Sequence, residues 1–259
     1  MTTPGLATPR AVTAGYGPSL HQSGDLFVPP GPPRAVVCLL HGGFWRMPYD
    51  RQELAPLAQS LALEGFAVWN MEYRRLGGGG GWPETFLDVA AGIDHLAVMS
   101  AGGEALPLDR VVVAGHSAGG HLALWSAARS RFPGVGPVRV PVMAVAGLAP
   151  VADLAAAHRL SVGRSAVAEF IGGSPQEAEA RYRVASPSAL LPLGARQLVL
   201  HGAQDQALPV ALSRDYAAAA SQAGDDIQFI ELPDAGHMDF LDPQSAAIGS
   251  FKHWLERLQ

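Results

Sequence analysis

The chain has 259 residues, of which 48% are hydrophobic and 16% charged, and its formal net charge at pH 7 is −5. A chain of this length buries about three quarters of its unfolded surface and needs no disulfide to hold a core, and without a basic excess it is not expected to bind nucleic acid. No apolar run approaches the roughly 18 residues of a membrane helix, the opening MTTPGLATPR lacks the apolar core of a secretory signal, and the single Cys38 excludes an intramolecular disulfide. We therefore expect a cytoplasmic protein with no membrane partner, and its state as monomer or dimer stays open.

The first 34 residues, which are rich in Pro and Gly, are predicted to form an N-terminal extension or edge strands. Residues 26–28 (LFV) precede two prolines and suit an edge strand, although a partly ordered tail fits the same composition. The pattern changes at Ala35. Residues 35–259 are therefore predicted to form one domain.

Short apolar runs alternate with segments of helical periodicity along the rest of the chain. Runs of this kind are typical of strands buried on both faces of a parallel sheet. They occupy residues 35–40, 66–71, 110–115, 140–147, 196–200 and 226–232, and the helical segments occupy residues 52–63, 84–99, 117–131, 209–223 and 243–258. The alternation predicts an α/β fold, with a mostly parallel central sheet and helices on both faces. Residues 152–191 are less regular and fit either a small cap insertion or a long crossover.

The segment Gly115-His116-Ser117-Ala118-Gly119 is a G-x-S-x-G match between a predicted strand and a predicted helix, which is the context this motif requires. A sharp turn there holds the serine in a strained conformation, and glycine two residues before and after it removes side chains that would clash. The hydroxyl then projects above the sheet, beside the positive end of the helix. Ser117 is therefore the predicted nucleophile.

A serine hydroxyl is a weak nucleophile, so it needs a base and an acid that orients the base. In this arrangement the chain order is Ser, then Asp or Glu, then His. Asp205 follows the apolar run 196–200, and His237 follows the run 226–232. Each lies at the carboxyl end of a predicted strand, the edge where such sheets keep their chemistry. We predict His237 as the base and Asp205 as its orienting acid.

Other acids and histidines near this edge are alternatives. Asp153 follows the strand next after the serine's own, where some hydrolases place the acid. Asp234 and Asp239 lie near the predicted base in sequence, but neither follows the penultimate strand. His116 and His121 flank the predicted nucleophile and suit packing or hydrogen bonding around it better than proton transfer.

The segment HGGFW, residues 41–45, ends the first strong strand. Tetrahedral intermediates carry an oxyanion, and each preorganised backbone N–H group beside it contributes about 3–4 kcal/mol. A Gly-rich turn leaving a strand explains this segment alone, but beside the serine motif an oxyanion loop fits it better. One donor is expected to be the N–H of Ala118, directly after the nucleophile, and the others are expected from this loop.

Four ordered segments, HGGFW, GHSAGGHLA, HGAQDQALP and GHMDF, together resemble the α/β-hydrolase superfamily. Within it, the chain is similar to the hormone-sensitive-lipase-like esterases and to the kynurenine formamidases (arylformamidases). Many such esterases carry HGGG, whereas Phe44 stands in the last position here. The form HGG-x-W, which Trp45 completes, is associated with the formamidase branch. The resemblance implies an α/β-hydrolase fold in which residues 35–259 are the catalytic domain.

The resemblance also implies the role of each matching residue. It implies that the pair Tyr73-Arg74 braces the oxyanion loop. It implies no cofactor. The sequence itself has no His, Asp and Glu grouping with metal-ligand spacing, so no metal is expected. The implied nucleophile, acid and base are Ser117, Asp205 and His237, and the implied oxyanion donors belong to Gly43, Phe44 and Ala118.

The predicted reaction is acyl transfer through a covalent acyl-enzyme. The expected substrate is a small-molecule short-acyl carboxylic ester or an aryl formamide such as N-formylkynurenine. A general carboxylesterase is the alternative within this class. An alternative from another class is a non-catalytic hydrolase-fold protein that binds a ligand, but such a protein would have lost a member of the triad. A peptidase with the same triad order is disfavoured as well, because it normally carries a large extra domain.

The acyl side of the pocket is predicted from the residues that follow Gly43. At least one of the large rings of Phe44 and Trp45 is expected near the acyl substituent, and His116 is expected to line the pocket with them. Aromatic bulk there leaves little room for a long chain, so acyl groups from formyl or acetyl to butyryl are expected on a larger leaving group. In the alternative, Trp45 points into the protein and anchors the loop.

Overall fold

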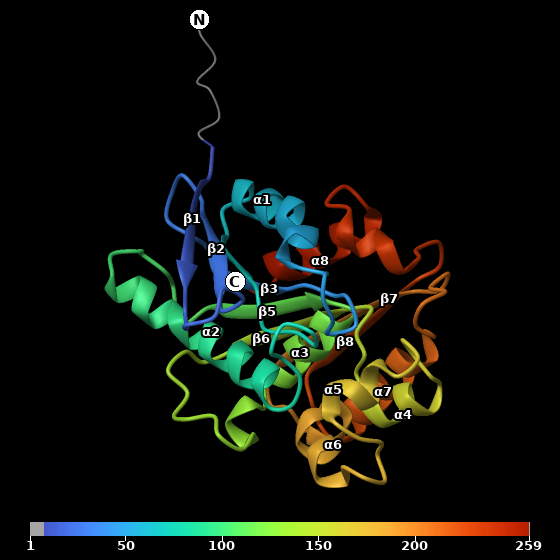
Figure 1. The fold of residues 1–259 in the computed structure, drawn as a ribbon. Helices are drawn as coiled ribbons and strands as arrows, with labels where there is room; N and C mark the ends of the chain where they lie inside the picture. Colours follow the sequence, from blue (N-terminus) through green and yellow to red (C-terminus); the bar gives the residue numbers. More distant parts are fainter. Residues whose placement is uncertain (1–7, 259) are drawn as a thin grey trace, which may run out of the picture.

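A central eight-stranded sheet with helices on both faces forms the protein (Figure 1). This computed structural model describes residues 8–258. The strand order is β1-β2-β4-β3-β5-β6-β7-β8, and every pair from β4 to β8 is parallel. The predicted α/β fold with a mostly parallel sheet is confirmed.

All six predicted parallel strands are present. They are β3 (Val36–Leu40), β4 (Ala67–Met71), β5 (Val111–His116), β6 (Ala144–Leu148), β7 (Arg196–Gly202) and β8 (Ile227–Leu232). Strand β6 begins later than its apolar run predicts, because residues 140–143 lie in a loop.

The five predicted helical segments are present too, some of them divided. They form α1 (Ala55–Leu63) after the short 3₁₀ helix η1 (Arg51–Leu54), α2 (Glu84–Ala101), α3 (Ala118–Ser126) with η2 (Arg129–Arg131), α7 (Ala211–Gln222), and α8 (Ala246–Glu256) after η4 (His237–Leu241). No helix among residues 8–258 is long and apolar enough to cross a membrane.

The side chains of β3 show why its run is continuously apolar. Val37 and Leu39 pack in one core layer with α1 and α8. Val36, Cys38 and Leu40 pack in the other layer, with α2 and α3. Successive side chains of a strand point to opposite faces, and both faces of this strand are fully buried.

The N-terminal part adds a hairpin to the sheet. Strands β1 (Arg10–Gly15) and β2 (Ser23–Val28) are antiparallel, and β2 pairs antiparallel with β4. Residues 26–28 are thus in a strand, whereas β1 was not predicted. No residue of β1 is buried, so no apolar run marks it. Residues 1–7 of the predicted extension lie outside the described residues.

Residues 152–191 form a small helical insertion between β6 and β7. Its elements are α4 (Leu154–Arg159), α5 (Ala166–Ile171), α6 (Glu179–Ala185) and the 3₁₀ helix η3 (Pro187–Leu190). Helices α4, α5 and α6 are grouped on the side of the molecule opposite the β1–β2 hairpin (Figure 1). Phe170 and Ile171 join the core layer beneath them.

Candidate active site

Ser117 lies where β5 turns directly into α3. Its backbone has φ 54° and ψ −115°, a strained conformation for a residue with a side chain. A Cβ atom on Gly115 would lie 2.3 Å from the carbonyl oxygen of Gly119, and one on Gly119 would lie 2.0 Å from that of Leu40. The structure therefore has the strained turn that the G-x-S-x-G segment predicts, and both glycines are needed for it.

The close contact at Gly119 brings the start of α3 to the end of β3. As a result Ser117 lies beside the segment 41–45, which we call the HGG loop. A Cβ atom on Gly42 would lie 3.4 Å from the Cβ of Ser117. Two segments distant in sequence thus meet at this edge of the sheet.

The HGG loop turns through three successive residues in the left-handed region. The φ angles are 93° at Gly43, 55° at Phe44 and 54° at Trp45. The N–H of Arg46 donates to the Gly43 carbonyl at 3.0 Å, and the N–H of Leu76 donates to the Trp45 carbonyl at 2.8 Å. These bonds fix the loop on itself and on the segment after β4.

His237 and Asp205 form the predicted contact between a histidine and a carboxylate. The His237 Nδ1 lies 2.6 Å from the Asp205 Oδ2. Among residues 8–258, no hydrogen bond joins the Ser117 hydroxyl to His237; in enzymes without substrate this bond often tightens only on binding. The two are linked through His116, whose Nε2 lies 3.0 Å from the His237 carbonyl oxygen and whose ring centroid is 4.6 Å from that of His237.

The Asp205 carboxylate faces only hydrogen-bond donors. Its Oδ1 accepts the N–H groups of Ala207 and Leu208, both at 2.8 Å, and its Oδ2 lies 3.1 Å from the His201 Nε2. Burial raises the pKa of Asp205, but the hydrogen bonds from His201, His237 and the Leu208 N–H outweigh it and hold the pKa well below its usual value. Because an ionised carboxylate only accepts, the Nδ1 of His237 carries a hydrogen, and the Nε2 of the neutral ring is free to accept one.

The alternative acids have other partners. Asp153 caps α4 by accepting the N–H of Ala156 at 2.8 Å. Asp239 accepts the N–H of Gly236 at 2.6 Å, and Asp234 is exposed. Of the carboxylates between residues 8 and 258, it is Asp205 that is bonded to the His237 ring.

Trp45 does not face a pocket, and this prediction is wrong. Its side chain is buried, with the residue 1% exposed. The ring stacks on Phe170 of α5 with centroids 4.6 Å apart, and it meets the ring of His121 edge-on at 5.3 Å. Burial of an indole ring is strongly favourable. Trp45 therefore anchors the HGG loop in the core, as the alternative held.

His116 also differs from its predicted place in the pocket wall. The residue is 3% exposed, and burial, together with the neighbouring His237, lowers its pKa to about 3. The neutral ring packs beneath His237 through the contact described above. His116 thus supports the His237 segment from within the protein, in keeping with the packing role expected of it as an alternative.

Phe44 packs at the margin of the core, against the insertion. It is half-buried, and a Cβ atom on Gly163 would lie 2.5 Å from the Phe44 Cδ1. Directly after the loop, the Arg46 Nη2 donates to the Glu169 Oε2 at 2.6 Å and to the Ser165 Oγ at 3.2 Å. The insertion therefore lies against the HGG loop and packs on Phe44.

Two buried side chains of this region have partners that the sequence did not predict. His201, at the end of β7, is bonded to Asp205 as described, and Glu72, directly after β4, lies 2.9 Å from His41 through its Oε1. Tyr73 contacts the loop as expected, since its hydroxyl donates to the His41 carbonyl at 2.7 Å. Its neighbour Arg74 pairs with Asp88 on α2 instead. A polar residue directly after an apolar strand was the available signal for Glu72.

Residues 8–258 contain no group of three or more His, Cys, Asp or Glu side chains that could hold a metal ion.

The sequence from residue 25 to residue 219 matches the BD-FAE family. The chain belongs to the BD-FAE family. The matched segment includes Ser117 and Asp205 and ends before His237.

This BD-FAE chain is similar to Esterase LipQ of Mycobacterium tuberculosis (strain ATCC 25618 / H37Rv), with 28% identity over 218 residues. The similarity covers 80% of this chain and 51% of LipQ, so the chain spans about half the length of this curated relative.

Two solved structures share the fold of this BD-FAE chain. A truncated form of a carbohydrate esterase from gut microbiota has a TM-score of 0.84 at 19% identity, and the match covers 98% of both chains. Esterase B from Lactobacillus Rhamnosis (HN001) has a TM-score of 0.82 at 19% identity, over 98% of this chain and 86% of the other. The predicted α/β-hydrolase fold is confirmed.

The close packing at Gly119 predicts opposite effects for two Gly→Ala changes in helices. Gly119→Ala pushes a methyl group against the backbone at the end of β3, and we expect it to lower the free energy of unfolding by about 3 kcal/mol or more. Gly249→Ala, inside α8 with no atom within 4 Å of the new Cβ, is expected to raise it by about 0.5–1 kcal/mol. Urea unfolding of the two variants measures both. A Gly119→Ala protein as stable as the unaltered chain would contradict the close approach of α3 to β3.

Proposed function

We propose that this protein is a serine esterase that hydrolyses small carboxylic esters through an acyl-enzyme on Ser117. The observation that carries the proposal is the 2.6 Å contact between His237 and a buried, ionised Asp205. The His237 ring packs on His116, the residue before a serine on a strained turn. The names of LipQ and of the two structural neighbours, all esterases, support the same reaction class.

In the proposed mechanism the His237 Nε2 takes the proton of Ser117 while the Oγ attacks the carbonyl carbon of the ester. Asp205 stabilises the imidazolium that forms. The tetrahedral intermediate collapses, and the alcohol leaves with the proton from His237. Water then attacks the acyl-enzyme with the same histidine as base, which releases the acid and restores the serine hydroxyl. The mechanism uses no cofactor.

The proposed oxyanion donors are the backbone N–H groups of Gly43, Phe44 and Ala118. Ala118 opens α3, so no carbonyl one turn earlier in the helix accepts its N–H. The HGG loop lies beside Ser117 at Gly42 and is held in its left-handed turn by the bonds described above. Donors fixed in this way stabilise the developing charge without reorganising during the reaction.

An ester is the favoured substrate over a formamide. The resemblance to the formamidases depended mainly on Trp45, whose ring packs in the core and leaves the substrate space to Phe44. The curated relative is an esterase by name. A comparison of kcat/KM for p-nitrophenyl acetate and N-formylkynurenine separates the two substrates.

The labelling of Ser117 tests the proposed triad. A fluorophosphonate probe is expected to modify Ser117 in the folded protein, as read by mass spectrometry.

Asp205→Asn is expected to lower kcat on p-nitrophenyl acetate by about 10⁴-fold, because the amide favours the wrong tautomer of His237. Asp153→Asn is the matched control and is expected to keep most of the activity, because asparagine caps a helix as well as aspartate does.

Absence of an adduct on Ser117 would contradict the enzyme proposal and favour a non-catalytic ligand-binding protein. A crippling Asp153→Asn together with a mild Asp205→Asn would instead show that the acid has been misassigned while the nucleophile stands.

The position of Phe44 against the insertion predicts a preference for short acyl groups. Its ring and Gly163 restrict the space beside the HGG loop, and crowding a pocket costs about 1–3 kcal/mol, or tenfold and more in rate. We expect kcat/KM to fall from acetyl and butyryl to octanoyl and palmitoyl esters of p-nitrophenol. Phe44→Ala is expected to raise the ratio of octanoyl to acetyl turnover about tenfold.

Phe27→Ala serves as the control, because Phe27 is another half-buried phenylalanine but lies in β2, between β1 and β4 and away from the HGG loop. It is expected to leave the chain-length profile unchanged. Faster turnover of octanoyl than acetyl esters by the unaltered protein would refute the short-acyl preference and indicate a general carboxylesterase.

A further inference from the structure

Glu72 is a buried carboxylate that no step of the proposed mechanism uses. The residue is 2% exposed, and all of its partners are donors. Its Oε1 lies 2.9 Å from the His41 Nε2, 3.0 Å from the Tyr73 backbone nitrogen and 3.2 Å from the Arg75 Nη2. Its Oε2 accepts the Arg51 N–H at 3.1 Å. An ionised carboxylate this deep in the protein is costly unless donors surround it.

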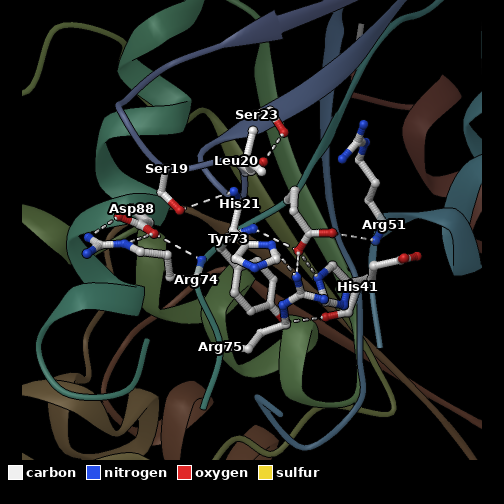
Figure 2. Close-up of polar contacts among 12 residues, drawn as sticks. Ser19, Leu20, His21, Ser23, His41, Arg51, Tyr73, Arg74, Arg75 and Asp88 are labelled. Atoms are coloured by element: carbon white, nitrogen blue, oxygen red, sulfur yellow. Dashed lines mark hydrogen bonds and ion pairs between the residues drawn. The ribbon is translucent and has the colours of Figure 1, made fainter. Parts of the chain in front are cut away.

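The contacts of Glu72 lead directly into the HGG loop through His41. The ring of His41 is held between the Glu72 carboxylate at Nε2 and the Gly42 carbonyl oxygen, which lies 2.9 Å from Nδ1. The Tyr73 hydroxyl donates to the His41 carbonyl, and the two rings stack with centroids 4.4 Å apart. Figure 2 shows His41, Tyr73 and Arg75 clustered together. The first residue of the loop is thus fixed at both its ring and its backbone.

The donors around Glu72, His41 first and Arg75 after it, keep its carboxylate charged. Arg75 is the permanently charged one. Its guanidinium is buried, at 1% exposure, and its Nη2 contacts the His21 Nδ1 at 2.9 Å as well as Glu72. Burial raises the pKa of Glu72, but the hydrogen bond from His41 and the charge of Arg75 outweigh it, so that the pKa lies below its usual value. Glu72 therefore holds His41 through a charge-assisted hydrogen bond, which is stronger than a neutral one.

We propose that Glu72 is the positioning residue of the oxyanion loop, because through His41 it holds the N–H groups of Gly43 and Phe44 in the geometry that stabilises the transition state. The inference rests on the proposed esterase function.

Such a role has a kinetic signature. Oxyanion donors act on charge that develops only in the transition state, so their displacement lowers kcat and leaves the KM for the substrate nearly unchanged. Loss of a single donor costs about 10²–10³-fold in kcat. A loosened loop that keeps its donors is expected to lose less than this.

Asp88 on α2 provides a matched control. Its carboxylate is 1% exposed and also faces only donors: the Arg74 N–H at 3.0 Å, the Arg74 Nε at 2.8 Å and Nη2 at 2.6 Å, and the Gln22 Nε2 at 2.7 Å. Between residues 8 and 258, no hydrogen bond or ion pair joins Asp88 to the HGG loop. Figure 2 shows the Arg74–Asp88 pair to one side of the His41 cluster.

The test compares Glu72→Gln with Asp88→Asn in the full chain. Each replaces a buried carboxylate by its isosteric amide, so both are expected to lower the unfolding temperature. Glu72→Gln is expected to lower kcat on p-nitrophenyl acetate about tenfold or more with KM within about threefold. Asp88→Asn is expected to keep kcat within about twofold. Equal kcat values for the two folded variants would overturn the inference.

A double-mutant cycle with His41→Gln shows whether Glu72 acts through His41. His41→Gln alone is expected to lower kcat with little change in KM, and adding Glu72→Gln is expected to cause no further loss. Losses that multiply would overturn the inference.

If Glu72→Gln does not fold, His41→Gln alone decides the question, because an unchanged kcat overturns the inference. If the unaltered protein does not hydrolyse esters, both the inference and the esterase proposal are overturned. If the unaltered protein is active but the variants do not behave as expected, the inference alone is overturned.

Discussion

The close approach of α3 to the carboxyl end of β3 determines where the candidate site lies. It depends on Gly119, where a Cβ atom would lie 2.0 Å from the Leu40 carbonyl oxygen. Because no side chain separates the two elements, Ser117 lies next to Gly42, and the N-terminus of α3 faces the HGG loop. The sheet also determines the position of the site, because parallel strands end at one edge and the residues that follow them therefore lie close together.

Two further pairs, each made of one histidine and one buried carboxylate, complete the candidate site. They lie on either side of Ser117 in the strand order. Glu72 follows β4 and holds His41, while Asp205 follows β7 and holds His237. Both carboxylates face donors only, which offsets the cost of burying an ionised group. In the proposed enzyme one pair fixes the groups that stabilise the oxyanion, and the other fixes the base. The insertion from residue 152 to residue 191 packs on Phe44 and Trp45 of the HGG loop.

The fold was predictable because β3 to β8 are strands of a parallel sheet with helices on both faces, which leaves short apolar runs in the sequence. Strand β1 left no such run, since it lies exposed at the edge and forms by pairing with β2. The contact of Asp205 with His237 was predictable from position, as each follows a strand. The direction of the Trp45 ring and the contact of Glu72 with His41 were not, because each depends on packing between segments distant in the chain.

The central claim is that Ser117 and the HGG loop act on one carbonyl group. It is tested most directly by a crystal structure of the protein inactivated with a p-nitrophenyl methylphosphonate ester, which loses nitrophenolate as a serine–phosphorus bond forms. The predicted result is phosphorus bonded to the Ser117 Oγ, with its phosphoryl oxygen about 2.7–3.1 Å from the backbone nitrogens of Phe44 and Ala118. Phosphorus on another side chain, or a phosphoryl oxygen directed away from the loop into solvent, would contradict it.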